Sequence, residues 1–425
     1  MNHLLKKVHV VDPRAGLDQV CDVLIGEDAI ILDPAAVSER YEAIPGEGLY
    51  LFPGLVDLHV HFREPGFMHK EDIGSGIRAA LAGGVTSALA MPNTDPAIDN
   101  FKLVDYQLKR AKRSGFDLMV AACASKGLMG REAVDVGEVK RAGAMAITDD
   151  GKPIKSDLLM ENILRQCRRH DLVCMQHAED LDISHNAPLN LGKVSEKTQL
   201  MGQSSKAESS LIARDIGLAR KISARYHVLH LSCKESLSLL REVKRDSKLF
   251  SCEVAPHHLL LSEYAASGLD TNKKMIPPLR SREDVQSLVE GLEEGIIDAV
   301  SSDHAPHSER EKALSFADAP FGVVGLESSI LVLLTLVKNR RLSLNRAIAS
   351  MTANPAKILG QPDRIGTLVG PHALKNAVLV DIDHRSVFSQ RHLKGRSKNS
   401  AFLGMELYGR VLATFLNGRL AYRAF

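Results

Sequence analysis

The stretch Leu55-Val-Asp-Leu-His-Val-His61 is a short apolar run that ends in histidines, and it opens a series of such runs along the chain. Before residue 51 the chain alternates short β-like runs with turn residues and lacks long helical patterns. From there on, each apolar run is followed by a stretch with room for a helix. This pattern predicts eight strands, at 55–60, 86–91, 118–122, 144–148, 172–176, 227–231, 250–255 and 297–302.

Eight strands that alternate with helices are typical of a parallel sheet, and eight is the number that closes a (β/α)8 barrel. Apolar residues spaced three and four apart predict helices at 71–81 and 207–222. The longest gap between strands contains the polar stretch 183–205, which we expect to be a loop over one face. The predicted fold class is therefore α/β, with a TIM-type barrel at its centre.

The two ends of the chain have a different character from the middle. After residue 366 the β-like pattern returns in the runs 377–381, 411–415 and 420–422. Since neither end makes a convincing domain alone, we expect both to combine into one small β-sandwich domain beside the barrel. Residues 1–51 and 366–425 would form this domain, and residues 52–365 would form the barrel.

The composition excludes several classes of protein. In 425 residues, 54 basic and 52 acidic side chains give a net charge of +2, which argues against a dedicated nucleic-acid binder. No apolar run approaches the roughly 20 residues of a membrane span, and the N-terminus lacks the features of a signal peptide. The six cysteines form no C-x-x-C pair, so we expect reduced, buried thiols in a cytoplasmic protein.

Histidines and aspartates recur where the predicted strands end. His59 and His61 stand at i and i+2, so they project from the same face of the first strand. The carboxyl ends of barrel strands meet at one face, where these two would be joined by Asp149 or Asp150, His177, His230 and Asp303. Strand alternation lets only one of the two neighbouring aspartates point inward and does not decide which. Four imidazoles and two carboxylates suit one or two divalent ions, with zinc as the expected metal.

Longer motifs carry a resemblance to a known family. They are Val60-His-Phe-Arg-Glu-Pro-Gly66, Thr148-Asp-Asp-Gly151, Glu253-Val-Ala-Pro-His-His258, Asp303-His-Ala-Pro-His307 and Ala319-Pro-Phe-Gly-Val-Val-Gly-Leu-Glu327. The chain resembles the amidohydrolase superfamily and, within it, is similar to the bacterial dihydroorotases that pair with aspartate carbamoyltransferase. The resemblance extends over nearly the whole chain.

The resemblance implies a complete metal site and a reaction. The implied ligands are His59, His61, Asp150, His177, His230 and Asp303, with Asp150 bridging two Zn²⁺ ions per subunit. Many relatives in the superfamily use a carboxylated lysine as the bridge, whereas aspartates stand at this strand end. The implied activity is the reversible hydrolysis of (S)-dihydroorotate to N-carbamoyl-L-aspartate in pyrimidine biosynthesis. A homo-oligomer and an association with aspartate carbamoyltransferase are also implied.

The expected metal ligands suggest a mechanism for the hydrolysis. A metal ion lowers the pKa of a bound water to about 7, which supplies hydroxide for attack on an unactivated amide. A group must then carry the proton to the leaving nitrogen, and Asp303 stands at a strand end beside the expected metal. We therefore expect Asp303 to act as the proton shuttle, while a role as ligand alone stays open.

Arg63 follows His61 by two residues and should share its face if the strand persists. Its guanidinium suits the carboxylate of a small anionic substrate. The resemblance implies further substrate contacts from His61, Asn93, Ile276, His307, Phe321 and Gly322. Without the resemblance, Asn93 would be taken as a turn cap and His307 as a loop histidine. The charged stretch 308–320 is either a lid or a surface loop.

Position 276 departs from the family pattern, because the family usually carries an asparagine that is expected to touch the substrate where this chain has Ile276. Losing one such contact costs about 0.5–1.5 kcal/mol. Another cyclic-amide hydrolase, such as a hydantoinase or an allantoinase, therefore stays open as an alternative, although Arg63 argues against it. The second alternative is a non-catalytic subunit that scaffolds aspartate carbamoyltransferase. Relatives of that kind have lost metal-binding residues, whereas this chain retains all six.

Overall fold

The computed structural model describes residues 1–35 and 40–424. Its centre is a parallel sheet in the order β15-β14-β13-β10-β9-β8-β7-β6. The strands are β6 (Leu55–Val60), β7 (Val85–Ala90), β8 (Asp117–Ala122), β9 (Ala146–Ile147), β10 (Val173–Gln176), β13 (Tyr226–Val228), β14 (Phe250–Val254) and β15 (Ala299–Val300). A parallel bridge between Val60 and His304 joins the first strand to the segment after the last and closes the barrel. The eight predicted strands are thus confirmed, in order.

The barrel strands are buried on both faces. All six residues of β6 and all six of β7 are buried. Side chains such as Val56, Leu89 and Met175 form one apolar cluster inside the barrel, while Leu55 and Val120 belong to a second cluster under the helices. Burial on both faces explains why these strands appear in the sequence as continuous apolar runs rather than alternating ones.

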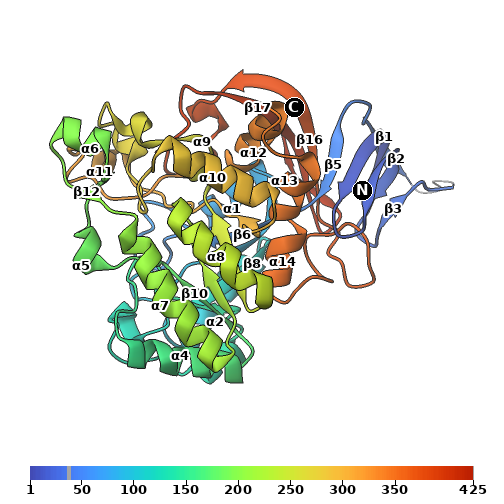
Figure 1. Cartoon of the computed structure of the whole chain (residues 1–425). Helices are drawn as coiled ribbons and strands as arrows, with labels where there is room; N and C mark the ends of the chain where they lie inside the picture. The colour runs from blue at the N-terminus through green and yellow to red at the C-terminus, as the bar shows by residue number, and fades with distance from the viewer. Residues whose placement is uncertain (36–39, 425) are drawn as a thin grey trace.

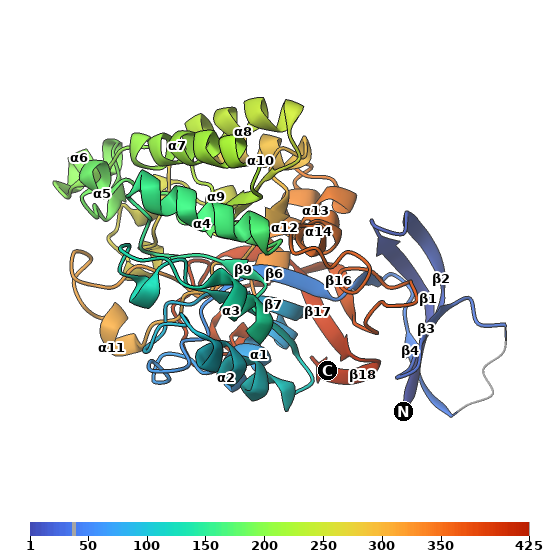
Figure 2. The same cartoon turned by 90° about the horizontal axis from the view of Figure 1, so that it is seen from below.

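Helices surround the barrel (Figures 1 and 2). Those that follow the strands are α1 (Ile73–Ala82), α2 (Phe101–Lys112), α3 (Val136–Ala142), α4 (Asp157–Arg169), α7 (Lys206–Ile222), α8 (Lys234–Asp246), α10 (Arg282–Glu293), α12 (Ser329–Lys338), α13 (Leu344–Ser350) and α14 (Ala353–Ile358). The predictions at 71–81 and 207–222 correspond to α1 and α7. None of the described helices is long and apolar enough to cross a membrane.

The expected loop at 183–205 is wrong in detail. This part of the chain contains α5 (Leu181–Ser184), β11 (Leu189–Asn190), α6 (Lys193–Thr198) and β12 (Gly202–Gln203), and β11 pairs with β12 in parallel. The buried Arg280 holds the two strands, because its Nη1 donates to Asn190 Oδ1 at 3.1 Å and to the carbonyl of Gln203 at 2.9 Å. This order comes from a distant residue and is absent from the local sequence pattern.

Both ends of the chain combine into one further sheet, as predicted. Its order is β18-β17-β16-β5-β1-β2-β3, and β4 pairs with β1. The strands are β1 (Asn2–Asp12), β2 (Leu17–Ile25), β3 (Ile30–Leu32), β4 (Tyr41–Pro45), β5 (Tyr50–Pro53), β16 (Ala377–Val387), β17 (Glu406–Leu416) and β18 (Arg419–Arg423). They form one continuous hydrogen-bonded sheet, where a sandwich was expected, and Figure 1 shows β5 and β16 side by side next to the barrel. The domain boundaries at 51 and 366 stay a prediction.

Candidate metal centre

The predicted ligand residues lie together at the carboxyl ends of the barrel strands. The ligand atoms of His59, His61 and Asp150 lie within 4.8 Å of one another, and so do those of Asp150, His177 and His230. Asp150 belongs to both groups. Its Oδ1 lies 3.4 Å from Nε2 of His59 and 3.7 Å from Nε2 of His230. One buried carboxylate therefore stands between two pairs of imidazoles.

Asp303 lies beside the first of these groups. Its Oδ1 is 3.3 Å from Nε2 of His61 and 3.6 Å from Nε2 of His59. The Asp303 backbone has a φ of +45°, in the left-handed region that few non-glycine residues adopt. The chain thus turns sharply after β15, and the carboxylate is held against the two histidines of β6.

The donor set fits a divalent cation. His59 Nε2 and Asp150 Oδ1 are buried and have no hydrogen-bond partner within the described residues. Leaving such groups unpaired costs about 1–3 kcal/mol each, a cost that a bound cation would remove. Imidazole nitrogen and carboxylate oxygen are donors that suit zinc and similar ions.

The electrostatics of the centre favour ionised carboxylates. Burial by itself would raise the pKa of Asp150 and of Asp303, but the neighbouring imidazoles, that of His59 foremost, outweigh it and hold both pKa values below the ordinary range. Both groups therefore carry negative charge at neutral pH, which attracts a cation.

The structure decides between the two adjacent aspartates. Asp149 turns away from the histidines, and its Oδ1 accepts hydrogen bonds from the amides of Ala124 at 2.8 Å and Ser125 at 2.9 Å. Asp150 points to the histidine cluster instead. Because β9 ends at Ile147, both aspartates lie in the turn after the strand, where alternation along the strand no longer applies.

Two buried glutamates that are not among the predicted site residues orient the histidines. Glu253, on β14, accepts from His59 Nδ1 at 2.9 Å and from Ser301 Oγ at 2.6 Å. Glu179 accepts from His177 Nε2 at 2.9 Å. Such carboxylates fix the ring orientation and the tautomer of a ligating histidine. A charged residue inside the apolar run Phe250-Ser-Cys-Glu-Val254 is the sequence signal that points to Glu253.

The first strand ends before Arg63, within the predicted range 55–60, so the condition under which Arg63 would share the face of His61 is not met. β6 ends at Val60, and Arg63 has a φ of +60°. The guanidinium of Arg63 nevertheless contacts the segment that follows β15. Its Nε donates to the carbonyl of Pro306 at 3.3 Å, and its Nη2 lies 3.5 Å from His307 Nε2. Burial lowers the pKa of Arg63 to about 10, so the group stays charged at neutral pH.

Asn93 lies between two of the predicted ligands. Its Oδ1 accepts from His61 Nδ1 at 2.8 Å, and its Nδ2 lies 3.4 Å from Asp150 Oδ2. In the segment that follows β15, His307 Nε2 donates to the carbonyl of Phe321 at 2.8 Å. The next residue, Gly322, has a φ of +124°, and a Cβ there would lie 2.7 Å from Ala305 Cβ, so the close approach requires glycine.

Ile276 stands in a segment that borders Phe321 and Gly322. It is half-buried, and two residues earlier the carbonyl of Lys274 accepts from the amide of Gly322 at 3.0 Å. The Lys274 ammonium lies 4.6 Å from the centroid of the Phe321 ring. Position 276 is therefore near the predicted substrate contacts, although its side chain offers no hydrogen bond.

The charged stretch 308–320 contains α11 (Glu309–Lys312), and the buried Lys312 fixes its position through hydrogen bonds. Lys312 Nζ donates to the carbonyl of Pro320 at 3.0 Å and to that of Gly322 at 2.9 Å. These bonds hold the stretch against the segment that carries Phe321 and Gly322.

The sequence matches the model of the amidohydrolase family over residues 50–421. A curated relative named dihydroorotase, from Citrifermentans bemidjiense, is 40% identical, and the match covers 100% of both chains. A second dihydroorotase, from Carboxydothermus hydrogenoformans, is also 40% identical and covers 100% of this chain and 98% of its own.

Solved structures with the same fold include hydantoinases. An L-hydantoinase (dihydropyrimidinase) from Arthrobacter aurescens superposes with a TM-score of 0.86 at 24% identity, covering 99% of this chain and 96% of its own. A D-hydantoinase gives a TM-score of 0.85 at 20% identity, covering 100% and 95%. At this level of identity the likeness concerns the fold alone.

Proposed function

The chain belongs to the amidohydrolase family and, within it, to the bacterial dihydroorotases, and from this premise we propose that its buried histidine–aspartate centre hydrolyses the ring amide of dihydroorotate. The reaction is the reversible addition of water to (S)-dihydroorotate, which opens the ring to N-carbamoyl-L-aspartate. The observation that carries the proposal is the pair of ligand groups that share Asp150, in a chain that matches dihydroorotases over its whole length.

The divalent metal of this centre is proposed to be two zinc ions per subunit. His59 and His61 would hold one ion, His177 and His230 the other, and Asp150 would bridge them, with Asp303 as a further ligand of the first. Bound ions supply an activated water and polarise the target carbonyl. A lysine bridge is disfavoured, because the nearby Lys155 forms an ion pair with Asp182 and is exposed.

Asp303 is proposed as the catalytic proton carrier. Its carboxylate is ionised at neutral pH and lies beside His59 and His61, so it is placed to accept the proton of the attacking water. It then gives that proton to the ring nitrogen as the C–N bond breaks, so that the carboxylate is restored for the next turnover.

The substrate carboxylate is proposed to bind on the side of Arg63. The half-buried guanidinium of Arg63 offers two parallel N–H donors, a geometry that matches a carboxylate. We assign the remaining contacts to His61, Asn93, His307, Phe321 and Gly322, and the position of Ile276 to the edge of the same pocket. We further propose a cytoplasmic homo-oligomer that associates with aspartate carbamoyltransferase. The family resemblance is the support for this last assignment.

Elemental analysis of the purified protein, together with parallel assays on dihydroorotate, hydantoin and allantoin, tests these assignments. We expect about two zinc ions per subunit and turnover of dihydroorotate alone. Turnover of another ring without turnover of dihydroorotate would overturn the assigned substrate. A metal-free protein without activity under any added metal would favour the scaffolding alternative instead.

A further inference from the structure

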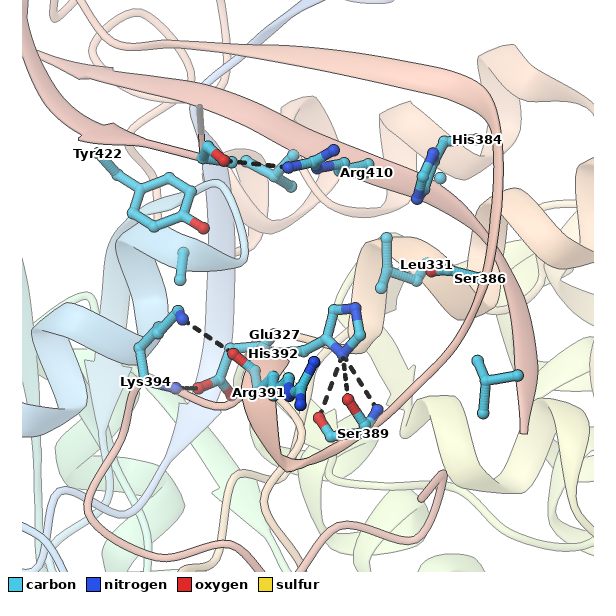
Figure 3. Close-up of a pocket in the computed structure, with 15 residues that line it drawn as sticks. Glu327, Leu331, His384, Ser386, Ser389, Arg391, His392, Lys394, Arg410 and Tyr422 are labelled. Atoms are coloured by element: carbon cyan, nitrogen blue, oxygen red, sulfur yellow. Dashed lines mark hydrogen bonds between the residues drawn. The ribbon is translucent and has the colours of Figure 1, made fainter. Parts of the chain in front are cut away.

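A pocket of about 450 Å³, separate from the histidine–aspartate centre, lies where the C-terminal strands meet α12 (Figure 3). Residues of β16, β17 and β18 and of the segment 389–394 line it, together with Leu331 of α12. It shares no lining residue with the histidine–aspartate centre. Its volume lies within the range of small-molecule sites, roughly 300–1,000 Å³.

Three cationic side chains line this pocket without a carboxylate partner. They are Arg391, Lys394 and Arg410, and none of them forms an ion pair within the described residues, although many other basic residues of the chain do. Two of the three donate to backbone carbonyls instead: Lys394 Nζ donates to Arg391 O at 2.8 Å and Arg410 Nη2 donates to Ala424 O at 3.0 Å. All three residues are exposed and line the same pocket, so an anion that enters it would have access to their charged groups.

The acidic side chain in the described lining, Glu327, serves as an anchor rather than as a counter-ion. It is 5% exposed, and its Oε1 accepts from the amides of Lys394 at 2.6 Å and Gly395 at 3.2 Å. These bonds fix the segment that carries Arg391 and Lys394. Its other oxygen, Oε2, is buried and has no hydrogen-bond partner in the described chain, which leaves an acceptor for a donor group at the base of the pocket.

Neutral donors complete the lining. The His392 ring lies against Ser389, whose amide nitrogen is 3.0 Å and whose carbonyl oxygen is 3.2 Å from Nδ1, and in either tautomer the ring offers one N–H donor. Figure 3 shows this ring between Glu327 and Ser389, while Tyr422 presents its hydroxyl on another side of the pocket. Two guanidiniums, an ammonium and these donors suit a group that carries several negatively charged oxygens.

We propose that this pocket binds a phosphorylated small molecule of nucleotide size. The cations and neutral donors would take the phosphate oxygens, and a hydroxyl of the same molecule would donate to Glu327. A polynucleotide is disfavoured, because the chain as a whole carries a net charge of only +2.

Calorimetric titration of the whole protein with adenosine 5′-monophosphate, at about 150 mM salt, tests the proposal. We expect saturable binding to one site per chain. The double variant Arg391→Gln/Lys394→Gln should weaken it at least about tenfold, since each charge-assisted hydrogen bond is worth roughly a factor of ten. The control Arg385→Gln lies on β16, where Arg385 pairs with Glu406 and does not line the pocket, and it should bind as the wild type does.

Three further measurements distinguish the possible outcomes of the titration. Retained dihydroorotase activity shows that the double variant is folded, and the single variant Arg410→Gln provides an independent loss of binding. Titration with inorganic phosphate distinguishes a site for the free ion, which would bind it as tightly as the nucleotide, from a site for the whole molecule. No saturable binding up to about 10 mM, or equal binding by the double variant, would overturn the proposal.

Discussion

Asp150 and Asp149 are adjacent in sequence but face opposite surroundings. Asp150 lies between the two pairs of histidines, whereas Asp149 caps the amides of Ala124 and Ser125. The pair therefore offers a matched comparison of one carboxylate in the proposed metal site with one outside it.

Asp150→Asn should release metal and lower kcat/KM by at least about a hundredfold, because it removes the charge that both proposed ions share. Elemental analysis and steady-state kinetics measure these effects. Asp149→Asn, the control, should keep its metal. It should lower the free energy of unfolding instead, because the neutral amide oxygen is a weaker acceptor than the carboxylate for the amides of Ala124 and Ser125. Equal metal content in the two variants would argue against the bridging role.

Ile276→Asn restores the residue that the family usually carries. We expect KM for dihydroorotate to fall by about two- to tenfold with kcat little changed, because one hydrogen bond to the bound substrate is worth about 0.5–1.5 kcal/mol. Steady-state kinetics with dihydroorotate and hydantoin check this. An unchanged KM would mean that position 276 does not face the substrate.

Among the elements, the short pieces at 183–205 depend on one buried arginine. Arg280 is 1% exposed, its Nε donates to Ser232 Oγ at 3.0 Å, and its Nη1 holds β11 and β12. From β12, Gln203 Nε2 donates at 2.7 Å to Glu179, which also holds His177. Hydrogen bonds thus connect the segment 183–205 to the histidine cluster through Glu179.

Arg280→Met should cost about 3–5 kcal/mol of stability, because it leaves Glu208 buried without its cation at 4.0 Å. Limited proteolysis should then cut between residues 183 and 205 faster than in the wild type. Arg280→Lys should rescue little, since an ammonium cannot reproduce the forked hydrogen bonds. Unchanged proteolysis in both variants would contradict this role.

The stretch around α11 should be sensitive to pH through Lys312. Burial, followed by the neighbouring Lys274, lowers the pKa of Lys312 from its ordinary 10.5 to about 7. Between about pH 7 and 10 the unfolded chain therefore binds one proton more at this residue than the folded chain, so stability rises with pH over that window.

The difference in free energy of unfolding between the wild type and Lys312→Met should accordingly widen as pH rises from about 7 to 9. Chemical denaturation at several pH values measures it. The methionine variant also leaves carbonyls of Pro320 and Gly322 without their donor, so hydrogen exchange of residues 308–322 should quicken. A difference that is constant with pH would show that Lys312 is charged throughout.

In the whole molecule, the proposed metal centre draws ligands from five different strand ends of the barrel. Removal of the ions would leave ionised carboxylates and imidazoles buried together. Chelation should therefore lower the Tm by several degrees, and the Tm should recover with added zinc in a concentration-dependent way, since a ligand of the folded state stabilises it by mass action. Differential scanning calorimetry checks this, and a Tm unaffected by chelation would argue against a buried metal centre.

The terminal sheet is joined to the barrel by specific contacts. β16 pairs with β5, which leads directly into β6, and the amide of Arg396 donates to Glu71 at the start of α1. The phosphorylated-ligand pocket exists only because these C-terminal strands lie against α12. Neither this contact nor the pocket corresponds to a motif in the sequence.

The amino-acid sequence by itself determined the eight strands, the two helices named from their apolar spacing and the ligand types at the strand ends. These are local properties, because the period of apolar residues follows directly from the geometry of a strand or helix. Only the tertiary structure decided that Asp150 faces the histidines, that Glu253 and Glu179 orient them, and that Arg63 contacts Pro306 and His307. Such side-chain pairings join residues that are often more than 50 positions apart, so their geometry depends on how the whole chain closes on itself.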